Sequence, residues 1–288
     1  MGVNIQTIKD IRFYLLQELE GIYPEPELSS LTNIIIKTLT GVTKLHQVYL
    51  SDQSVNNSQA ERCIKICSEL KTGKPIQYIL GETIFYDCLI RVTPSTLIPR
   101  PETEELVHYT IRENKGFAGN IIDFGTGSGC IAIALARNFP ESTVTGIDIS
   151  EEALGVAKEN SILNNVNITF QKGDILNMDI STLPLSGIII SNPPYVRESE
   201  KYLMNRNVLD FEPHQALFVS DTDPLVFYRA ILRVAEIILL PGGSVWFEIN
   251  ESLGSLMVDL MKSFGFVNIR VIKDINGKDR IINGLKND

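Results

Sequence analysis

A run of isoleucines that stops at two prolines limits the folds open to this chain. Residues 188–190 are isoleucine, and Ser191 is followed at once by the tetrapeptide Asn192-Pro193-Pro194-Tyr195. Such an apolar run is typical of a strand buried on both faces of a parallel sheet. Because proline cannot donate to a strand ladder, the strand must end at this tetrapeptide. Ligands of open α/β sheets bind at the carboxyl ends of the strands, so we expect a ligand site here.

The tetrapeptide carries groups suited to holding a planar amino group. Asn192 has an amide with donors and an acceptor, Pro193 offers a carbonyl without an N–H, and Tyr195 adds an aromatic face. Two acceptors and a ring are enough to orient an –NH2 group and to cover it. An ordinary turn after a strand is the simpler alternative, which would be preferred for a lone Asn-Pro. The isoleucine run before it and a glycine loop upstream favour a functional role.

From residue 120 the sequence alternates between short apolar runs and longer amphipathic segments. This alternation predicts an α/β fold with a mostly parallel sheet and helices on both of its faces. The end of the chain has the pattern of a hairpin around Asn276-Gly277. The expected strands are 121–124, 143–148, 168–171, 188–191 and 244–249, the expected helices are 130–137, 151–163 and 225–239, and the expected hairpin joins 267–271 to 280–285.

The first 75 residues have a different pattern, which is typical of a small helical bundle. Apolar residues recur at helical spacing in segments 7–20 and 27–39, and again in a helix that a capping box at Ser58–Glu61 is expected to open. The segment contains no catalytic constellation. We therefore predict that residues 1–75 form a bundle that docks a macromolecular partner.

The segment that follows the bundle changes character again. Residues 76–100 are rich in side chains that favour strands, among them Tyr78 and Ile79. We expect this segment to be a β-hairpin linker. It leads through a rigid, proline-rich stretch, in which Arg100 lies between two prolines, to a catalytic domain at residues 101–288.

Length and cysteine usage exclude several classes of protein. A chain of 288 residues suggests about two domains. No stretch approaches the roughly 18 apolar residues of a membrane span, so no membrane association is expected. The four cysteines include no Cys-x-x-Cys pair and the chain has three histidines, which argues against a metal site or a disulfide framework. This usage fits a reducing cytoplasm.

The charge distribution argues against a partner bound through nucleic-acid phosphates. The net charge is −9, and residues 1–75 contribute nothing to it, with 8 basic and 8 acidic side chains. The remaining residues carry 18 basic and 27 acidic side chains, which accounts for the whole excess. Proteins that bind nucleic acid mainly through phosphates need basic surfaces. We therefore expect no direct contact with nucleic acid.

A glycine loop and two acidic residues predict a nucleoside cofactor. Residues 125–129, Gly-Thr-Gly-Ser-Gly, lie between an expected strand and an expected helix, where glycines allow close approach to a ligand. Asp148 ends the next strand and can accept both ribose hydroxyls, and Asp174 follows the third strand, where it can meet an adenine amino group. Two simpler roles stay open, since Asp148 could cap the following helix and Asp174 could be a turn residue.

The loop and the tetrapeptide together resemble class I S-adenosylmethionine-dependent methyltransferases that act on planar amino groups. The match extends further and identifies the HemK/PrmC family of peptide chain release factor glutamine methyltransferases. It covers roughly residues 75–288, and the helical amino-terminal part is compatible with it. The matching segments are 75–81, 97–104, 123–129, 190–195, 212–213 and 216–217.

The resemblance implies a Rossmann-like domain that binds S-adenosylmethionine, releases S-adenosylhomocysteine and methylates the glutamine of a Gly-Gly-Gln motif in a release factor. We also expect a cytoplasmic monomer without a bound metal, because the sequence offers no cluster of metal ligands. The residues predicted for catalysis are Asn192, Pro193 and Tyr195. Those predicted for cofactor binding are Gly125, Thr126, Gly127, Ser128, Gly129, Asp148, Ile149, Asp174, Ile175 and Asn192, and those for substrate binding are Asn192, Pro193, Pro194, Tyr195, Arg100 and Glu102.

The sequence departs from the family pattern at two places, and two other functions stay possible. Ile175 stands where the family can carry an aromatic residue, and residues 221–225 stand where Asp-Gly-Leu is common. Both departures affect details of the pocket and not the class of reaction. The alternative enzyme is an adenine amino-group methyltransferase acting on nucleic acid. A nucleoside-binding protein without catalysis is the third possibility, which the intact tetrapeptide disfavours.

Overall fold

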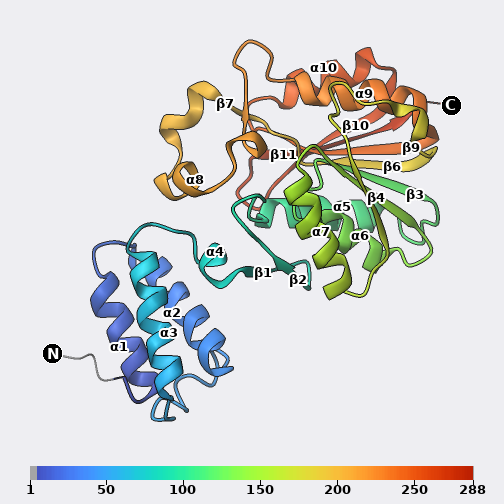
Figure 1. Cartoon of the computed structure of the whole chain (residues 1–288). Helices are drawn as coiled ribbons and strands as arrows, with labels where there is room; N and C mark the ends of the chain where they lie inside the picture. The colour runs from blue at the N-terminus through green and yellow to red at the C-terminus, as the bar shows by residue number, and fades with distance from the viewer. Residues whose placement is uncertain (1–4, 288) are drawn as a thin grey trace. The chain divides into compact units, whose positions relative to one another are not determined.

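The computed structural model describes residues 5–287, and the chain forms two compact units, Met1–Leu80 and Gly81–Asp288 (Figure 1). Each unit encloses its own cluster of buried hydrophobic side chains, so the chain folds around separate cores. Among the described residues, no helix is both long enough and apolar enough to cross a membrane.

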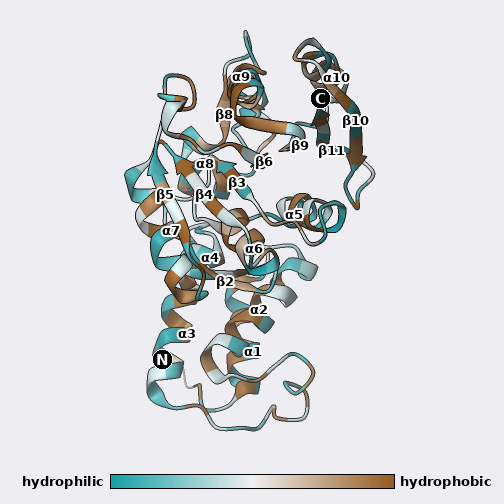
Figure 2. Ribbon diagram, turned by 90° about the vertical axis from the view of Figure 1, so that its right-hand side faces the viewer, coloured by the Kyte–Doolittle hydropathy of each residue, from teal (hydrophilic) through white to brown (hydrophobic). Residues whose placement is uncertain are grey.

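Helices α1 (Ile8–Leu19), α2 (Glu25–Thr40), α3 (Asn57–Leu70) and α4 (Ile76–Leu80) make up the first unit. Their apolar residues recur every three or four positions and meet in one core, which confirms the predicted helical stripes. Figure 2 shows the same pattern as alternating brown and teal along α1, α2 and α3. The side chains with no exposed surface in this core include Ile11, Leu15, Leu19, Ile35, Ile36, Cys63 and Cys67.

The start of α3 differs from the prediction. The capping box expected at Ser58–Glu61 is wrong, because Asn56 caps the helix instead. Asn56 Oδ1 accepts from Gln59 N at 2.9 Å, and Gln59 Oε1 accepts from Asn56 N at 2.8 Å. The two side chains thereby satisfy two amides that the first turn of a helix leaves without partners.

All four cysteines are buried and free. Cys63 and Cys67 lie on one face of α3 within the core of the first unit. Burial raises the pKa of Cys63 to about 12, so its thiol stays protonated and acts as a small apolar side chain.

The predicted hairpin is present, but it begins further along the sequence than expected. Strands β1 (Glu82–Phe85) and β2 (Cys88–Arg91) pair antiparallel, and the turn residues Tyr86 and Asp87 both have positive φ, as a two-residue hairpin turn requires. The expectation of strand at Tyr78 and Ile79 is wrong, because both lie in α4. Pro75 initiates this short helix: its carbonyl accepts from the amides of both residues, at 3.0 and 3.1 Å.

The second unit is built on a seven-stranded sheet. Its strand order is β10-β11-β9-β6-β3-β4-β5, with parallel pairs from β9 to β5 and antiparallel pairs at β11. The predicted α/β class and the terminal hairpin are therefore confirmed. The strands are β3 (Asn120–Phe124), β4 (Thr143–Asp148), β5 (Ile168–Lys172), β6 (Ser186–Ser191), β9 (Leu239–Glu248), β10 (Phe266–Lys273) and β11 (Asp279–Lys286).

Helices cover both faces of this sheet (Figure 1). On one side are α9 (Val226–Ile238) and α10 (Gly254–Ser263), which share a core with Ile122 and Ile189 of the central strands. On the other side are α5 (Pro101–Glu113), α6 (Cys130–Asn138) and α7 (Glu151–Leu163). The three isoleucines of β6 have no exposed surface, as a strand covered on both faces requires.

The segment between β6 and α9 contains structure that the sequence did not predict. Two short parallel strands, β7 (Val196–Arg197) and β8 (Phe218–Val219), bracket two 3-10 helices and one α-helix. The helices are η2 (Glu198–Leu203), α8 (Arg206–Phe211) and η3 (His214–Ala216), and a further 3-10 turn, η1 (Ile180–Thr182), precedes β6. This insertion starts directly after the Asn-Pro-Pro-Tyr tetrapeptide and borders the site described next.

Candidate active site

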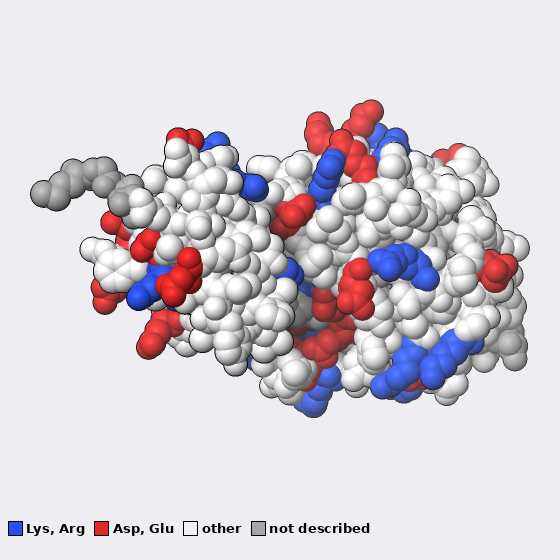
Figure 3. Space-filling model, turned by 90° about the horizontal axis from the view of Figure 1, so that it is seen from below, with Lys and Arg blue, Asp and Glu red and all other residues white. Residues whose placement is uncertain are grey.

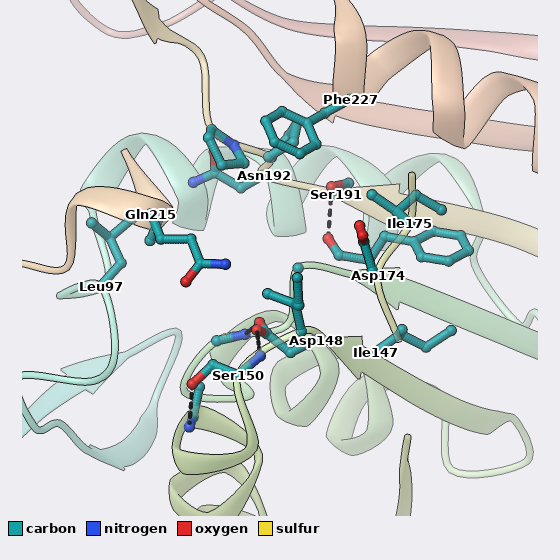
Figure 4. Close-up of a pocket in the computed structure, with 18 of the residues that line it drawn as sticks. Leu97, Ile147, Asp148, Ser150, Asp174, Ile175, Ser191, Asn192, Gln215 and Phe227 are labelled. Carbon is teal, nitrogen blue, oxygen red and sulfur yellow. Dashed lines mark hydrogen bonds between the residues drawn. The ribbon is translucent and has the colours of Figure 1, made fainter. Parts of the chain in front are cut away.

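A cavity of about 400 Å3 opens at the carboxyl ends of the parallel strands. The residues that follow β3, β4, β5 and β6 all contribute to its lining, among them Gly125, Asp148, Asp174 and Asn192. Figure 4 shows Asn192 and Asp148 on opposite sides of the open space. The sheet topology therefore brings four separate sequence segments to one place, as expected for an open α/β sheet.

The glycine loop turns sharply beneath this cavity. Gly125 and Gly127 line the cavity, and Gly127 has a φ of 55°, which disfavours any residue with a side chain. Gly129, with a φ of 80°, begins α6, and a Cβ there would lie 3.1 Å from Ala157 Cβ. Thr126 and Ser128 are buried beneath the loop and do not line the cavity.

Asp148 is fixed by backbone amides at the edge of the cavity. Its Oδ2 accepts from Gly127 N at 2.8 Å and its Oδ1 from Ser150 N at 2.9 Å. Ser150, and not Asp148, caps α7, since its hydroxyl accepts from Ala153 N at 3.1 Å. Each carboxylate oxygen of Asp148 keeps a lone pair for a further donor. Burial raises the pKa of Asp148 because it disfavours the charged carboxylate. A further hydrogen-bond donor would stabilise this charged form.

Asp174 combines a place in the cavity wall with a local structural role. Its Oδ1 accepts from Leu176 N at 3.0 Å and its Oδ2 from Asn177 Nδ2 at 2.8 Å, the pattern of an Asx turn. The turn alternative raised by the sequence thus describes its contacts within the chain. Ile149 and Ile175 also line the cavity and provide apolar surface there.

The Asn-Pro-Pro-Tyr tetrapeptide forms the opposite wall. Asn192, Pro193 and Pro194 line the cavity, and Asn192 Nδ2 donates to Thr103 Oγ1 at 3.1 Å. Tyr195 lies outside the lining and donates its hydroxyl to Glu248 Oε1 at 2.9 Å. Burial, and after it the Glu248 carboxylate, holds the pKa of Tyr195 well above 10.0, so the phenol stays a donor.

Arg100 and Glu102 lie on the segment that enters α5, and neither lines the cavity. Arg100 Nη2 donates to Glu212 Oε1 at 2.5 Å, and Glu212 Oε2 accepts from Ile98 N at 3.2 Å. The Glu212 side chain is 1% exposed, so this ion pair ties segment 97–104 to the insertion that follows the tetrapeptide. Arg100, which lies between two prolines, thus has a structural partner within the chain.

Several cavity residues were not singled out by the sequence. Figure 4 shows the amide of Gln215 pointing into the open space, and the ring of Phe227 beside Asn192. Both lie after the tetrapeptide in segments without a local motif, so only the fold brings them here. Thr103 and Glu248, which support Asn192 and Tyr195, were not predicted either. Thr103 lies in segment 97–104, from which the resemblance singled out only Arg100 and Glu102, and Glu248 ends a strand without a distinctive pattern.

Two buried oxygen atoms beside the glycine loop have no hydrogen-bond partner among residues 5–287. They are Asp123 Oδ1 and Ser128 Oγ. Asp123 Oδ2 does accept from Thr126 Oγ1 at 2.7 Å, but burial raises the pKa of this carboxyl to about 7. Unpaired buried polar atoms are costly unless water satisfies them. Neither residue lines the cavity, so these two atoms do not face its ligand.

The chain is similar to proteins of known activity over nearly its whole length. It is 44% identical over 279 residues to a release factor glutamine methyltransferase of Flavobacterium psychrophilum, covering 96% of this chain and 98% of the relative. A second relative with the same name, from Bacteroides thetaiotaomicron, is 43% identical over 273 residues, covering 94% and 98%. Two family descriptions also match, the PrmC N-terminal domain at residues 14–81 and the Methyltransferase small domain at residues 103–210.

A solved structure supports the fold. A methyltransferase from Pyrococcus furiosus superimposes with a TM-score of 0.52, covering 81% of this chain and 100% of its own. Its sequence identity is 19%, so the likeness concerns the fold alone. The sheet and its flanking helices are thus those of a methyltransferase fold.

The buried Asp123 carboxyl predicts a pH dependence of stability. Its pKa in the folded protein is about 7, against an ordinary value of 3.8, so between these values the folded chain holds a proton that the unfolded chain has lost. Stability is therefore highest below the lower value and falls as the pH rises toward the upper one. Replacing Asp123 by Asn removes this loss, which is on the order of 4 kcal/mol.

Denaturant unfolding of both proteins at pH values from 4 to 8 would measure the effect. The difference in unfolding free energy, Asp123→Asn minus wild type, should grow with pH and level off above neutrality. A difference that stays constant across this range would show that Asp123 is ionised in the folded protein throughout.

Proposed function

The chain belongs to the release factor glutamine methyltransferases, and from this membership we propose that it transfers a methyl group from S-adenosylmethionine to the side-chain amide nitrogen of a glutamine in a peptide chain release factor. We infer that this glutamine is the one in a Gly-Gly-Gln motif. The observation that carries the proposal is that Asn192 and Pro193, each of which has a carbonyl acceptor, line the cavity. Such a pair matches the two N–H groups of a primary amide.

The residues around the cavity fit the cofactor. Asp148 keeps lone pairs for ribose hydroxyls, and Ile149 and Ile175 give apolar surface for the base. Asp174 lines the cavity, and we propose that it accepts from the adenine amino group. Gly125 and Gly127 let the backbone approach the ligand closely, and Gly129 allows the turn into α6. Thr126 holds the loop through its hydroxyl and Ser128 through its carbonyl, which accepts from Asn160 Nδ2 at 2.9 Å. When bound, S-adenosylmethionine supplies an electrophilic methyl group on a sulfonium, and S-adenosylhomocysteine is left.

The chain's own residues act mainly by orienting the amide. A glutamine nitrogen is a poor nucleophile because its lone pair is delocalised into the adjacent carbonyl. Asn192 Oδ1 and the Pro193 carbonyl, by each accepting one N–H, fix the nitrogen and favour its lone pair over that delocalisation. The same acceptors stabilise the positive charge that develops on the nitrogen. Positioning and electrostatic stabilisation of this kind account for large rate enhancements.

The remaining predicted substrate residues border this centre. Pro194 lines the cavity, and we propose that the Tyr195 ring, held through its hydroxyl by Glu248, packs near the amide plane. We further propose that segment 97–104, with Arg100 and Glu102, contacts the release factor next to the motif. The ion pair of Arg100 with the buried Glu212 gives this segment a fixed conformation for such contacts.

Charge supports a protein substrate over a nucleic acid. Residues 76–288 carry 18 basic and 27 acidic side chains, a difference of −9. Acidic as well as basic side chains appear on the face shown in Figure 3. The names of the relatives do not favour the alternative adenine methyltransferase. We infer a monomeric enzyme of the cytoplasm, where release factors act.

We propose that the helical bundle, residues 1–75, docks the release factor. It has a core of its own and leaves Leu45, Val48 and Tyr49 exposed, at 81%, 77% and 87%. Exposed aromatic and aliphatic side chains are common anchors in protein interfaces. The compact unit of the structure extends to Leu80, because Ile76, Ile79 and Leu80 pack against the same core.

The cofactor and substrate roles predict that one substitution lowers cofactor affinity and another lowers the methylation rate. Asp148→Ala should weaken S-adenosylmethionine binding by about 10- to 100-fold, since hydrogen bonds to a charged group contribute roughly 1.5–3 kcal/mol. Asn192→Ala should leave this affinity nearly unchanged and remove most of the single-turnover rate at saturating cofactor, because it deletes an acceptor aimed at the substrate.

Calorimetry for the cofactor and quenched-flow methylation of a Gly-Gly-Gln peptide would measure the two quantities. Each variant serves as the control for the other. An Asp148→Ala protein with unchanged affinity would contradict the cofactor role, and an Asn192→Ala protein with a near-normal rate would mean that another group orients the amide.

The docking role predicts that removing the bundle affects large substrates more than small ones. Deleting residues 1–80, the whole first unit, should lower kcat/KM for an intact release factor by about tenfold or more, as loss of an interface does. A short Gly-Gly-Gln peptide, which cannot reach the bundle, should lose much less. Cofactor affinity of the truncated protein is the control for its folding, and equal losses on both substrates would favour a purely structural bundle.

A further inference from the structure

A chain of hydrogen bonds leads from the buried end of β9 to the acceptor at the reacting centre. Thr103 Oγ1 donates to Glu248 Oε2 at 2.6 Å, and Asn192 Nδ2 donates to Thr103 Oγ1 at 3.1 Å. Thr103 and Glu248 are 3% and 1% exposed, so water does not compete for these contacts. These hydrogen bonds join α5, β9 and the residue after β6, which are far apart in sequence.

Glu248 determines which group donates and which accepts in each of these hydrogen bonds. Its two carboxylate oxygens accept one hydroxyl proton each, from Thr103 and from Tyr195. An ionised carboxylate can only accept. Burial raises the pKa of Glu248, while the Thr103 and Tyr195 hydroxyls, and after them the Arg280 guanidinium, oppose this shift by stabilising the charged form. Both hydroxyls must therefore donate toward Glu248.

The consequence for Asn192 follows from the valence of the Thr103 hydroxyl. A hydroxyl has one proton, and here it is committed to Glu248, so only a lone pair faces Asn192. The atom of the Asn192 amide next to Thr103 must then be the nitrogen. The oxygen, Oδ1, points the other way and accepts no hydrogen bond from any residue between 5 and 287. Asn192 lines the cavity, where Oδ1 is free to accept from a substrate.

The orientation matters because the two ends of an asparagine amide have nearly the same size. If the amide were flipped, its NH2 group would meet the NH2 group of the substrate glutamine, and two donors would face each other. Within the proposed function, this would remove the acceptor from the reacting nitrogen. We propose that Thr103, with its proton committed to Glu248, is the positioning residue that holds Asn192 as an acceptor toward the substrate amide.

Substitutions at Thr103 test this role directly. Thr103→Val keeps the shape of the side chain and removes the hydroxyl, so the single-turnover rate on a Gly-Gly-Gln peptide should fall by about 10- to 100-fold. Cofactor affinity, measured by calorimetry, should stay within about twofold of wild type. Thr103→Ser restores the hydroxyl and should recover most of the rate that valine loses.

Thr110→Val is a matched control on the same helix. Thr110 is also fully buried, and its hydroxyl donates to Leu106 O at 2.8 Å, away from Asn192. Losing this hydroxyl should cost stability of a similar size without lowering the methylation rate. A rate loss in Thr110→Val as large as in Thr103→Val would show that any buried hydroxyl of α5 has this effect, which contradicts the proposal.

A double-mutant cycle separates positioning from a structural role. If Thr103 acts through Asn192, Thr103→Val should cause no further loss of rate in an Asn192→Ala background. Losses that multiply would overturn the inference, because they would mean that Thr103 acts independently of Asn192. Long single-turnover time courses followed by mass spectrometry can measure the slow variants.

The same set of variants distinguishes this inference from the proposed function. A slow Asn192→Ala protein together with a Thr103→Val protein of normal rate would refute the positioning role alone. A normal rate in Asn192→Ala would refute the acceptor role of Asn192 itself, and the proposed mechanism with it.

Discussion

The hydrogen bond from Thr103 to the buried carboxylate of Glu248, at 2.6 Å, is the contact on which the geometry of the site depends. It joins the first turn of α5 to the last residue of β9, and through Asn192 it reaches the residue after β6. Burying a carboxylate is costly unless its oxygens are paired, and here each oxygen receives a hydroxyl proton. The polar network that results holds Asn192 in one arrangement at the cavity wall.

The parallel sheet explains why these groups meet. β6 lies between β3 and β9, so the glycine loop after β3, the tetrapeptide after β6 and Glu248 at the end of β9 share one edge. Backbone amides of the loop hold Asp148 on the proposed cofactor side of the cavity, and the side-chain network holds Asn192 on the proposed substrate side. A rigid sheet thus supplies the positions, and short polar contacts supply the orientation of the reacting groups.

The parts that could be predicted from sequence are those whose signal is local. The isoleucine run of β6, the glycine loop at 125–129 and the helical stripes of the first unit each lie within one short segment. Glu248 was missed because a single acid at the end of a strand has no distinctive pattern, and its partners lie far away in the sequence. The propensity of Tyr78 favours a strand, whereas the carbonyl of Pro75 and the packing of Ile76 and Ile79 against the helical core favour α4.

The activity proposed for this cavity is the methylation of a glutamine amide in a protein. Mass spectrometry of an intact release factor, after incubation with the enzyme and S-adenosylmethionine, tests this most directly. The account predicts one added methyl group, located by fragmentation on the side chain of the Gly-Gly-Gln glutamine, and none on a factor in which that glutamine is replaced by alanine. An unmodified release factor beside robust methylation of an adenine-containing oligonucleotide would contradict it.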